Sequence, residues 1–125
     1  MTEEFLIKVE ITSIFKRNIR RLAKKYRKIR NDVQSVIEQL ERGKLPGDRL
    51  SGIDYEVFKL RVRNSDIQKG KSGGYRLIYY VKTSTAIVLL TIYSKSEQED
   101  IAAEELLEII VAYERQPIED EEITD

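Results

Sequence analysis

Residues 58–81 read FKLRVRNSDIQKGKSGGYRLIYYV, the pattern of two strands joined by a hairpin rich in lysine and glycine. In the first strand Lys59, Arg61 and Arg63 alternate with apolar residues, and Arg76 follows in the second strand. Successive side chains of a strand point to opposite faces, so the first three cations are expected to share one face. Like charges side by side on a sheet repel each other. This face is therefore expected to meet a polyanion.

Around this hairpin the sequence predicts a sheet of four strands. Three of them lie at about 55–63, 74–82 and 86–93, and the last is a nearly continuous apolar run, typical of a central strand covered on both faces. Residues 4–11 alternate between apolar and polar side chains, which predicts a half-buried first strand.

Two helices are predicted between the first strand and the hairpin. Thr12 or Ser13 is expected to cap the first, whose apolar residues recur at helical spacing as far as Tyr26. Asn31 is expected to cap the second, and Gly43 is expected to end it.

A final helix is expected after the last strand. Ser94 and Ser96 are each followed by a glutamate three residues later, which is the pattern of two overlapping capping boxes. The order β-α-α-β-β-β-α predicts an α+β domain over residues 1–116, with a helical hairpin, a C-terminal helix and a mainly antiparallel four-stranded sheet. Residues 117–125 form an acidic tail that is expected to be disordered.

Composition narrows the function classes. The 125 residues contain no cysteine and no histidine, which excludes disulfides and thiolate zinc sites and removes the commonest general acid–base. The formal net charge is zero, but residues 16–30 carry nine cations and no acid, whereas residues 97–108 carry six acids and no cation. No apolar run is long enough to cross a membrane and the N-terminus is unlike a signal peptide, so a cytoplasmic protein is expected.

Several further cations are candidates for binding a nucleic-acid backbone. The glycine-rich segment 68–74 lacks the spacing of a phosphate-binding P-loop and leads into a strand, so its glycines are interpreted as hairpin residues. Solvated sheet and helix surfaces remain the alternative interpretation of the basic faces. The RNA-binding candidates are Arg63, Lys69 and Lys71 beside the strands, and Arg20, Lys24 and Arg27 in the first helical region.

The sequence shows no serine, carboxylate pair or metal-ligand cluster that predicts a hydrolytic site. An enzyme of this composition would act by positioning its substrate and by stabilising charge with lysine and arginine. RNA cleavage suits these means, because RNA supplies its own 2′-hydroxyl as the nucleophile and guanidinium groups can stabilise the transition state.

The chain resembles the RelE/ParE superfamily of toxins from type II toxin–antitoxin systems, and within it the HigB-like branch of RelE toxins. The resemblance rests on the element order and on segments 50–52, 58–62, 69–80 and 89–97. It implies an endonuclease without metal or cofactor that enters the ribosomal A site and cuts translated mRNA. It also implies a cognate antitoxin as partner.

The resemblance implies roles for five residues. Lys59 and Arg61 match the basic pair that contacts and activates the mRNA phosphate, and Arg76 matches the arginine that stabilises the scissile phosphate. Lys95 matches a basic residue in the loop before the last helix, and Tyr93 takes the place of a catalytic tyrosine.

Two positions depart from the RelE pattern. Ser96 stands where RelE has an arginine that acts as general acid, and Ala102 stands near the place of its C-terminal catalytic tyrosine. These departures keep two alternatives open: a ParE-like toxin that inhibits DNA gyrase without cleaving RNA, and an inactive relative that only pairs with its antitoxin. The sequence leaves the oligomeric state open.

Overall fold

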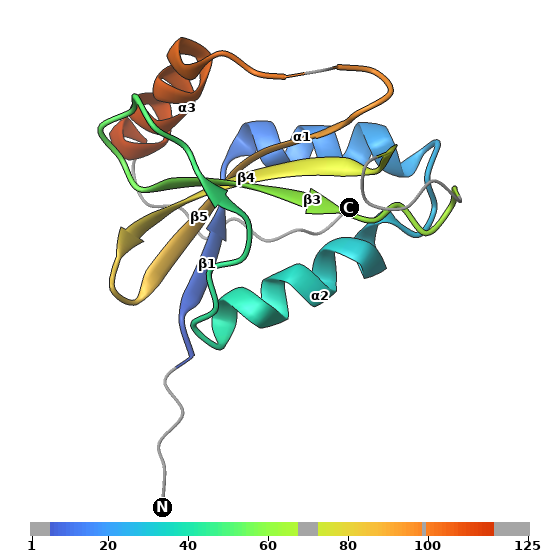
Figure 1. Cartoon of the computed structure of the whole chain (residues 1–125), viewed down its shortest axis with the longest axis horizontal. Helices are drawn as coiled ribbons and strands as arrows, with labels where there is room; N and C mark the ends of the chain where they lie inside the picture. Colours follow the sequence, from blue (N-terminus) through green and yellow to red (C-terminus); the bar gives the residue numbers. More distant parts are fainter. Residues whose placement is uncertain (1–5, 68–72, 99, 117–125) are drawn as a thin grey trace, which may run out of the picture.

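The fold is α+β, as predicted (Figure 1). The computed structural model describes residues 6–67, 73–98 and 100–116. Lys69, Lys71 and the predicted acidic tail 117–125 lie outside the described residues. None of the helices in these ranges has the length and apolar character that a bilayer crossing requires. The elements are β1 (Lys8–Ile11), α1 (Ser13–Ala23), α2 (Ile29–Glu41), β2 (Asp48–Arg49), β3 (Val57–Val62), β4 (Tyr75–Thr83), β5 (Ala86–Ser94) and α3 (Ala103–Arg115).

One sheet of five strands has the order β1-β5-β4-β3-β2. The pair β1–β5 is parallel and the other three pairs are antiparallel, which confirms the mainly antiparallel sheet. The predicted number of four strands is too low, because Asp48 and Arg49 pair with Lys59 and Phe58 and add the short strand β2 at the edge. A strand of two residues shows no alternation, so the sequence pattern does not reveal it.

Apolar side chains cover the sheet on both faces. The cluster on one face contains buried residues of α1 and α2, and the cluster on the other contains buried residues of α3. Figure 1 shows α2 and α3 on opposite sides of the sheet. Strand β5 supplies Leu89 to the first cluster and Leu90 to the second, so it is the central, doubly covered strand that its apolar run predicts.

The cap of α1 is confirmed and that of α2 is wrong. The Thr12 hydroxyl accepts a hydrogen bond from the Phe15 backbone N–H at 2.9 Å and donates one to the Leu90 carbonyl at 2.7 Å. Helix α2 begins at Ile29, two residues before Asn31, and has no side-chain cap. The side chain of Ile29 is fully buried, so packing against the core decides where this helix begins.

The two capping boxes predicted at Ser94 and Ser96 are also wrong. Ser94 is buried and still pairs with Tyr75 as the last residue of β5. Its hydroxyl lies 2.9 Å from that of Ser96, and α3 begins only at Ala103, without a side-chain cap. The ladder between β4 and β5 continues through the position where a helix was expected, because it satisfies more backbone groups than a cap does.

Buried tyrosines make stability depend on alkaline pH. Burial raises the pKa values of Tyr75, Tyr79 and Tyr80 above their usual value. A group whose pKa is higher in the folded state contributes stability that is complete below its unfolded pKa and is lost as the pH rises further. We therefore expect the free energy of unfolding to fall above a pH of about 10, the unfolded pKa of tyrosine.

The variant Tyr75→Phe separates this effect from packing. The Tyr75 hydroxyl is buried and has no hydrogen-bond partner among the described residues. Its removal should leave stability at neutral pH unchanged or higher and should shrink the alkaline loss, as measured by urea denaturation at both pH values. The control is Tyr79→Phe, which removes a 2.5 Å hydrogen bond to the Pro46 carbonyl and should cost about 1 kcal/mol at neutral pH. An equal loss for both variants would refute this account of Tyr75.

Candidate nucleic-acid interface

Four of the predicted site residues lie together on one face of the sheet. Arg76 on β4 pairs directly with Arg61 on β3 and, on its other side, with Tyr93 on β5. Residues directly opposite each other in an antiparallel pair have Cβ atoms about 5 Å apart, so the three side chains form a row across the strands. Lys59 lies two residues before Arg61 and therefore on the same face. We call Lys59, Arg61, Arg76 and Tyr93 the strand site.

The strand site shares its face of the sheet with α3. Val57 alternates with Lys59 and Arg61 along β3, and it packs in the cluster that contains α3. The connection from β5 to α3 reaches the strand site, because Asp100 contacts Lys59. Figure 1 shows this connection (orange) returning from the end of β5 to α3 above the sheet. The helix thus covers one end of the face, and the connection approaches the other.

Arg76 is the buried residue of the strand site. It is 6% exposed, whereas Arg61 is exposed and Lys59 is half-buried. Its Nη1 donates a hydrogen bond to the Tyr75 carbonyl at 3.2 Å. A guanidinium is costly to bury, and here another arginine stands directly opposite on β3. A solvated outer face does not describe this residue, whereas an anion placed between Arg61 and Arg76 would relieve their repulsion.

Tyr93 contributes a protonated phenol at neutral pH. Burial, followed by the charge of Asp100, raises the pKa of Tyr93 to about 12, against the opposing effect of the Arg76 guanidinium. Its hydroxyl is buried and has no hydrogen-bond partner of normal geometry among the described residues. A buried hydroxyl without a partner is costly, so this group is available as a donor to an oxygen atom of a ligand.

Asp100 is a site residue that the sequence does not reveal. Its Oδ1 lies 3.0 Å from Lys59 Nζ. The hydrogen bond from Lys59, followed by one from the Ile101 backbone N–H, lowers the pKa of Asp100, and the charge of Lys95 adds to the effect. The acids of residues 97–108 read as the water-facing side of a helix. Asp100 instead lies in the connection before α3, and nothing in its spacing points to Lys59.

Lys95 lies directly after β5, close to the strand site. Its backbone N–H donates to the Gly74 carbonyl at 2.9 Å, so it extends the contact between β4 and β5 by one residue. Its side chain is half-buried, and its charge acts on Asp100. Ser96, at the position where the resemblance expects an arginine, is exposed and bonded to Ser94.

The remaining predicted RNA-binding residues do not belong to the row. Arg63 lies beyond the end of β3 and is exposed. Arg20 lies in α1, Lys24 is its C-terminal cap, Arg27 lies in the turn before α2, and all three are exposed. Arg21 of the same helix forms an ion pair of 3.1 Å with Glu97, an acidic partner that its own helix does not supply.

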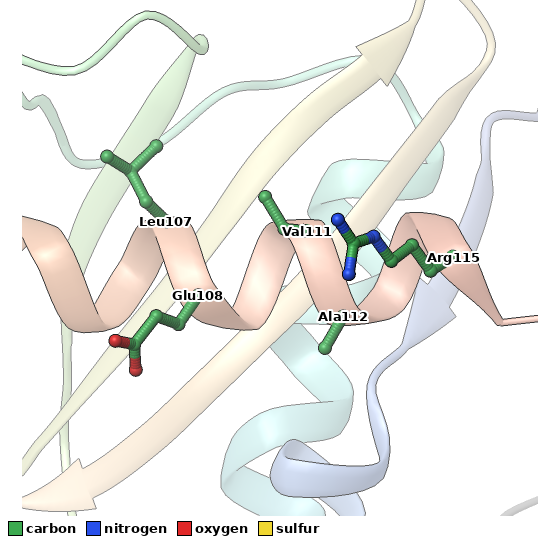
Figure 2. Close-up of a pocket in the computed structure, with 5 residues that line it drawn as sticks. All are labelled: Leu107, Glu108, Val111, Ala112 and Arg115. Atoms are coloured by element: carbon green, nitrogen blue, oxygen red, sulfur yellow. The ribbon is translucent and has the colours of Figure 1, made fainter.

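The surface hollows of the molecule lie away from the strand site. One is lined by Leu107, Glu108, Val111, Ala112 and Arg115 on the outer side of α3 (Figure 2). Another lies where Leu107 meets residues 52–55. Within the described ranges, no three histidine, cysteine, aspartate or glutamate side chains come together in a way that could hold a metal ion.

Comparison with known proteins gives one match. A family model described as the RelE toxin of the RelE / RelB toxin-antitoxin system matches residues 12–124. A search of curated proteins finds no match. The matched range contains every element from α1 to α3, and with them the whole strand site and Lys95.

Proposed function

Because the chain belongs to the RelE toxin family of toxin–antitoxin systems, we propose that it is a ribosome-dependent endonuclease that cleaves translated mRNA. The observation that carries the proposal is the register that puts Arg76 directly between Arg61 and Tyr93. Two cations and a phenol in one row suit a phosphate that gains negative charge during a reaction. Membership of the family also implies a cognate antitoxin as partner.

The proposed reaction uses the RNA itself as nucleophile. The 2′-hydroxyl of one nucleotide attacks the adjacent phosphorus, the bond from phosphorus to the 5′-oxygen of the next nucleotide breaks, and that oxygen takes up a proton. The products are a 2′,3′-cyclic phosphate and a 5′-hydroxyl. Arg61 and Arg76 stabilise the charge that develops on the phosphate oxygens, and the burial of Arg76 makes its interaction stronger than it would be in water.

Lys59 and Tyr93 complete the proposed reaction site. Lys59 holds the phosphate or polarises the 2′-hydroxyl, since an ammonium group favours the deprotonated form of a nearby hydroxyl. Tyr93 keeps its proton at neutral pH, so it can donate a hydrogen bond to a phosphate oxygen but cannot act as a base. Lys95 adds positive charge at the end of the row.

The cations outside the row are proposed to hold the RNA backbone. Lysine and arginine on a nucleic-acid interface neutralise phosphates and release counterions, so binding through them weakens as salt increases. This group comprises Arg63, Lys69 and Lys71 beside the strands, and Arg20, Lys24 and Arg27 at α1.

Mapping mRNA ends in a purified translation reaction tests the proposal. With the protein added to translating ribosomes, we expect new mRNA ends inside the reading frame, at positions occupied by ribosomes. The same mRNA without ribosomes should remain intact. Intact mRNA on translating ribosomes at a protein concentration that arrests cell growth would contradict the proposal.

One observation favours a second candidate, a ParE-like inhibitor of DNA gyrase. Ser96 is a short hydroxyl side chain bonded to Ser94, and it offers no acid at the position where RelE has an arginine. In this case purified gyrase with DNA would accumulate cleavage complexes when the protein is added, while mRNA on ribosomes would stay intact. The two assays therefore separate the two candidates.

A further inference from the structure

The connection between β5 and α3 brings acids to two basic surfaces. Asp100 Oδ1 lies 3.0 Å from Lys59 Nζ in the strand site. Glu97 Oε1 lies 3.1 Å from Arg21 Nη1 on α1. The chain thus places its own carboxylates beside cations that, on the proposed function, face RNA.

The Asp100 carboxylate is held in place by its neighbours. The Ile101 backbone N–H donates to Oδ1 at 2.8 Å, and Gln98 Nε2 donates to the Asp100 carbonyl at 2.8 Å. The carboxylate oxygen that contacts Lys59 is therefore oriented by the local backbone. The Lys59 side chain is 29% exposed and that of Asp100 is 69% exposed, so the pair lies at the surface, where an incoming anion can reach it.

We infer that Asp100 competes with the RNA phosphate for Lys59, and so keeps the strand site partly neutralised in the free protein. The inference rests on the proposed function. A carboxylate and a phosphate both bind an ammonium group through short, charge-assisted hydrogen bonds. A phosphate that approaches Lys59 meets the negative charge of Asp100 at the same atom, and the two anions repel each other.

Binding of RNA then requires Asp100 to move away from Lys59 or to remain as an unfavourable neighbour. Both outcomes weaken the complex, and both disappear when the charge of Asp100 is removed. The connection that carries Asp100 is a built-in restraint on RNA binding, and Glu97 applies a similar restraint to Arg21.

The variant Asp100→Asn tests this restraint, because it removes the charge and keeps the oxygen that accepts from Ile101. We expect it to bind a short single-stranded RNA about five to ten times more tightly than the wild type, by fluorescence anisotropy at moderate salt. The matched control is Glu108→Gln, which makes the same charge change on the outer side of α3 and should alter affinity by less than about twofold. In a Lys59→Met background, Asp100→Asn should lose most of its effect.

The outcomes separate the inference from the proposed function. If Asp100→Asn binds RNA no more tightly than the wild type, while Lys59→Met and Arg61→Ala weaken binding, Asp100 only positions Lys59 and the inference is overturned. If Lys59→Met and Arg61→Ala bind like the wild type, the strand site does not face RNA, and the proposed function is overturned with it. Thermal unfolding of each variant verifies that it is folded.

Discussion

Replacing Arg76 by methionine is expected to lower mRNA cleavage on translating ribosomes by at least about a hundredfold, the effect of removing one buried donor to a charged transition state. Arg76 is central in the row, between Arg61 and Tyr93, and it is the buried cation among them. Methionine keeps much of the aliphatic volume, so the core beside the strand site stays filled. The measurement is the rate at which new mRNA ends appear in single-turnover conditions.

Two matched variants show whether the effect belongs to the guanidinium and its position. Arg76→Lys keeps the charge but loses the planar fork of donors, and it should retain only part of the activity. Arg63→Met makes the same change at an exposed arginine beyond the end of β3 and should alter the rate by a few-fold at most. A rate for Arg76→Met within about threefold of the wild type, in a folded protein, would refute the assignment of Arg76.

The second large effect is expected on stability, from Gly74→Ala. A Cβ atom at Gly74 would lie 2.1 Å from the Val62 carbonyl oxygen and 3.0 Å from the Asn64 backbone nitrogen. Both are main-chain atoms, so β3 and β4 would have to separate at this end. We expect a loss of about 3 kcal/mol or more in the free energy of unfolding, by urea denaturation. Cleavage should fall as well, because the pair Arg61–Arg76 is close to the point of separation.

Gly52→Ala provides the control for this prediction. Gly52 has a φ of +79° and would place its Cβ in open space, so its cost comes from backbone conformation alone. That cost should be about 1–2 kcal/mol. Equal losses for the two variants would show that the close approach of β3 and β4 at Gly74 is not what constrains the chain there.

The part of the site that follows from strand alternation could be predicted from the sequence. Alternation puts Lys59 and Arg61 on one face of β3, and the structure pairs this face with Arg76. The apolar run of β5 correctly indicates its central position. These features depend on neighbours in the sequence and on a period of two, which a single sequence displays directly.

The contacts that depend on tertiary structure could not be predicted in this way. Ser94 and Ser96 carry a good local signal for a helix start, but the ladder to β4 continues through Ser94 and overrides it. The pair Lys59–Asp100 joins residues far apart in the chain, and the burial of Arg76 follows from the elements packed around β4. Local propensity carries no information on either contact.

The chemical identity of the mRNA ends tests the central claim most directly, since that claim is cleavage by the RNA's own 2′-hydroxyl on the row of Arg61, Arg76 and Tyr93. Mass spectrometry of the fragments released from translating ribosomes measures it. The predicted result is a 2′,3′-cyclic phosphate, or the 3′-phosphate formed from it, upstream of the cut and a 5′-hydroxyl downstream. A 3′-hydroxyl upstream and a 5′-phosphate downstream would contradict the account, because those ends arise when water, and not the 2′-hydroxyl, attacks the phosphate.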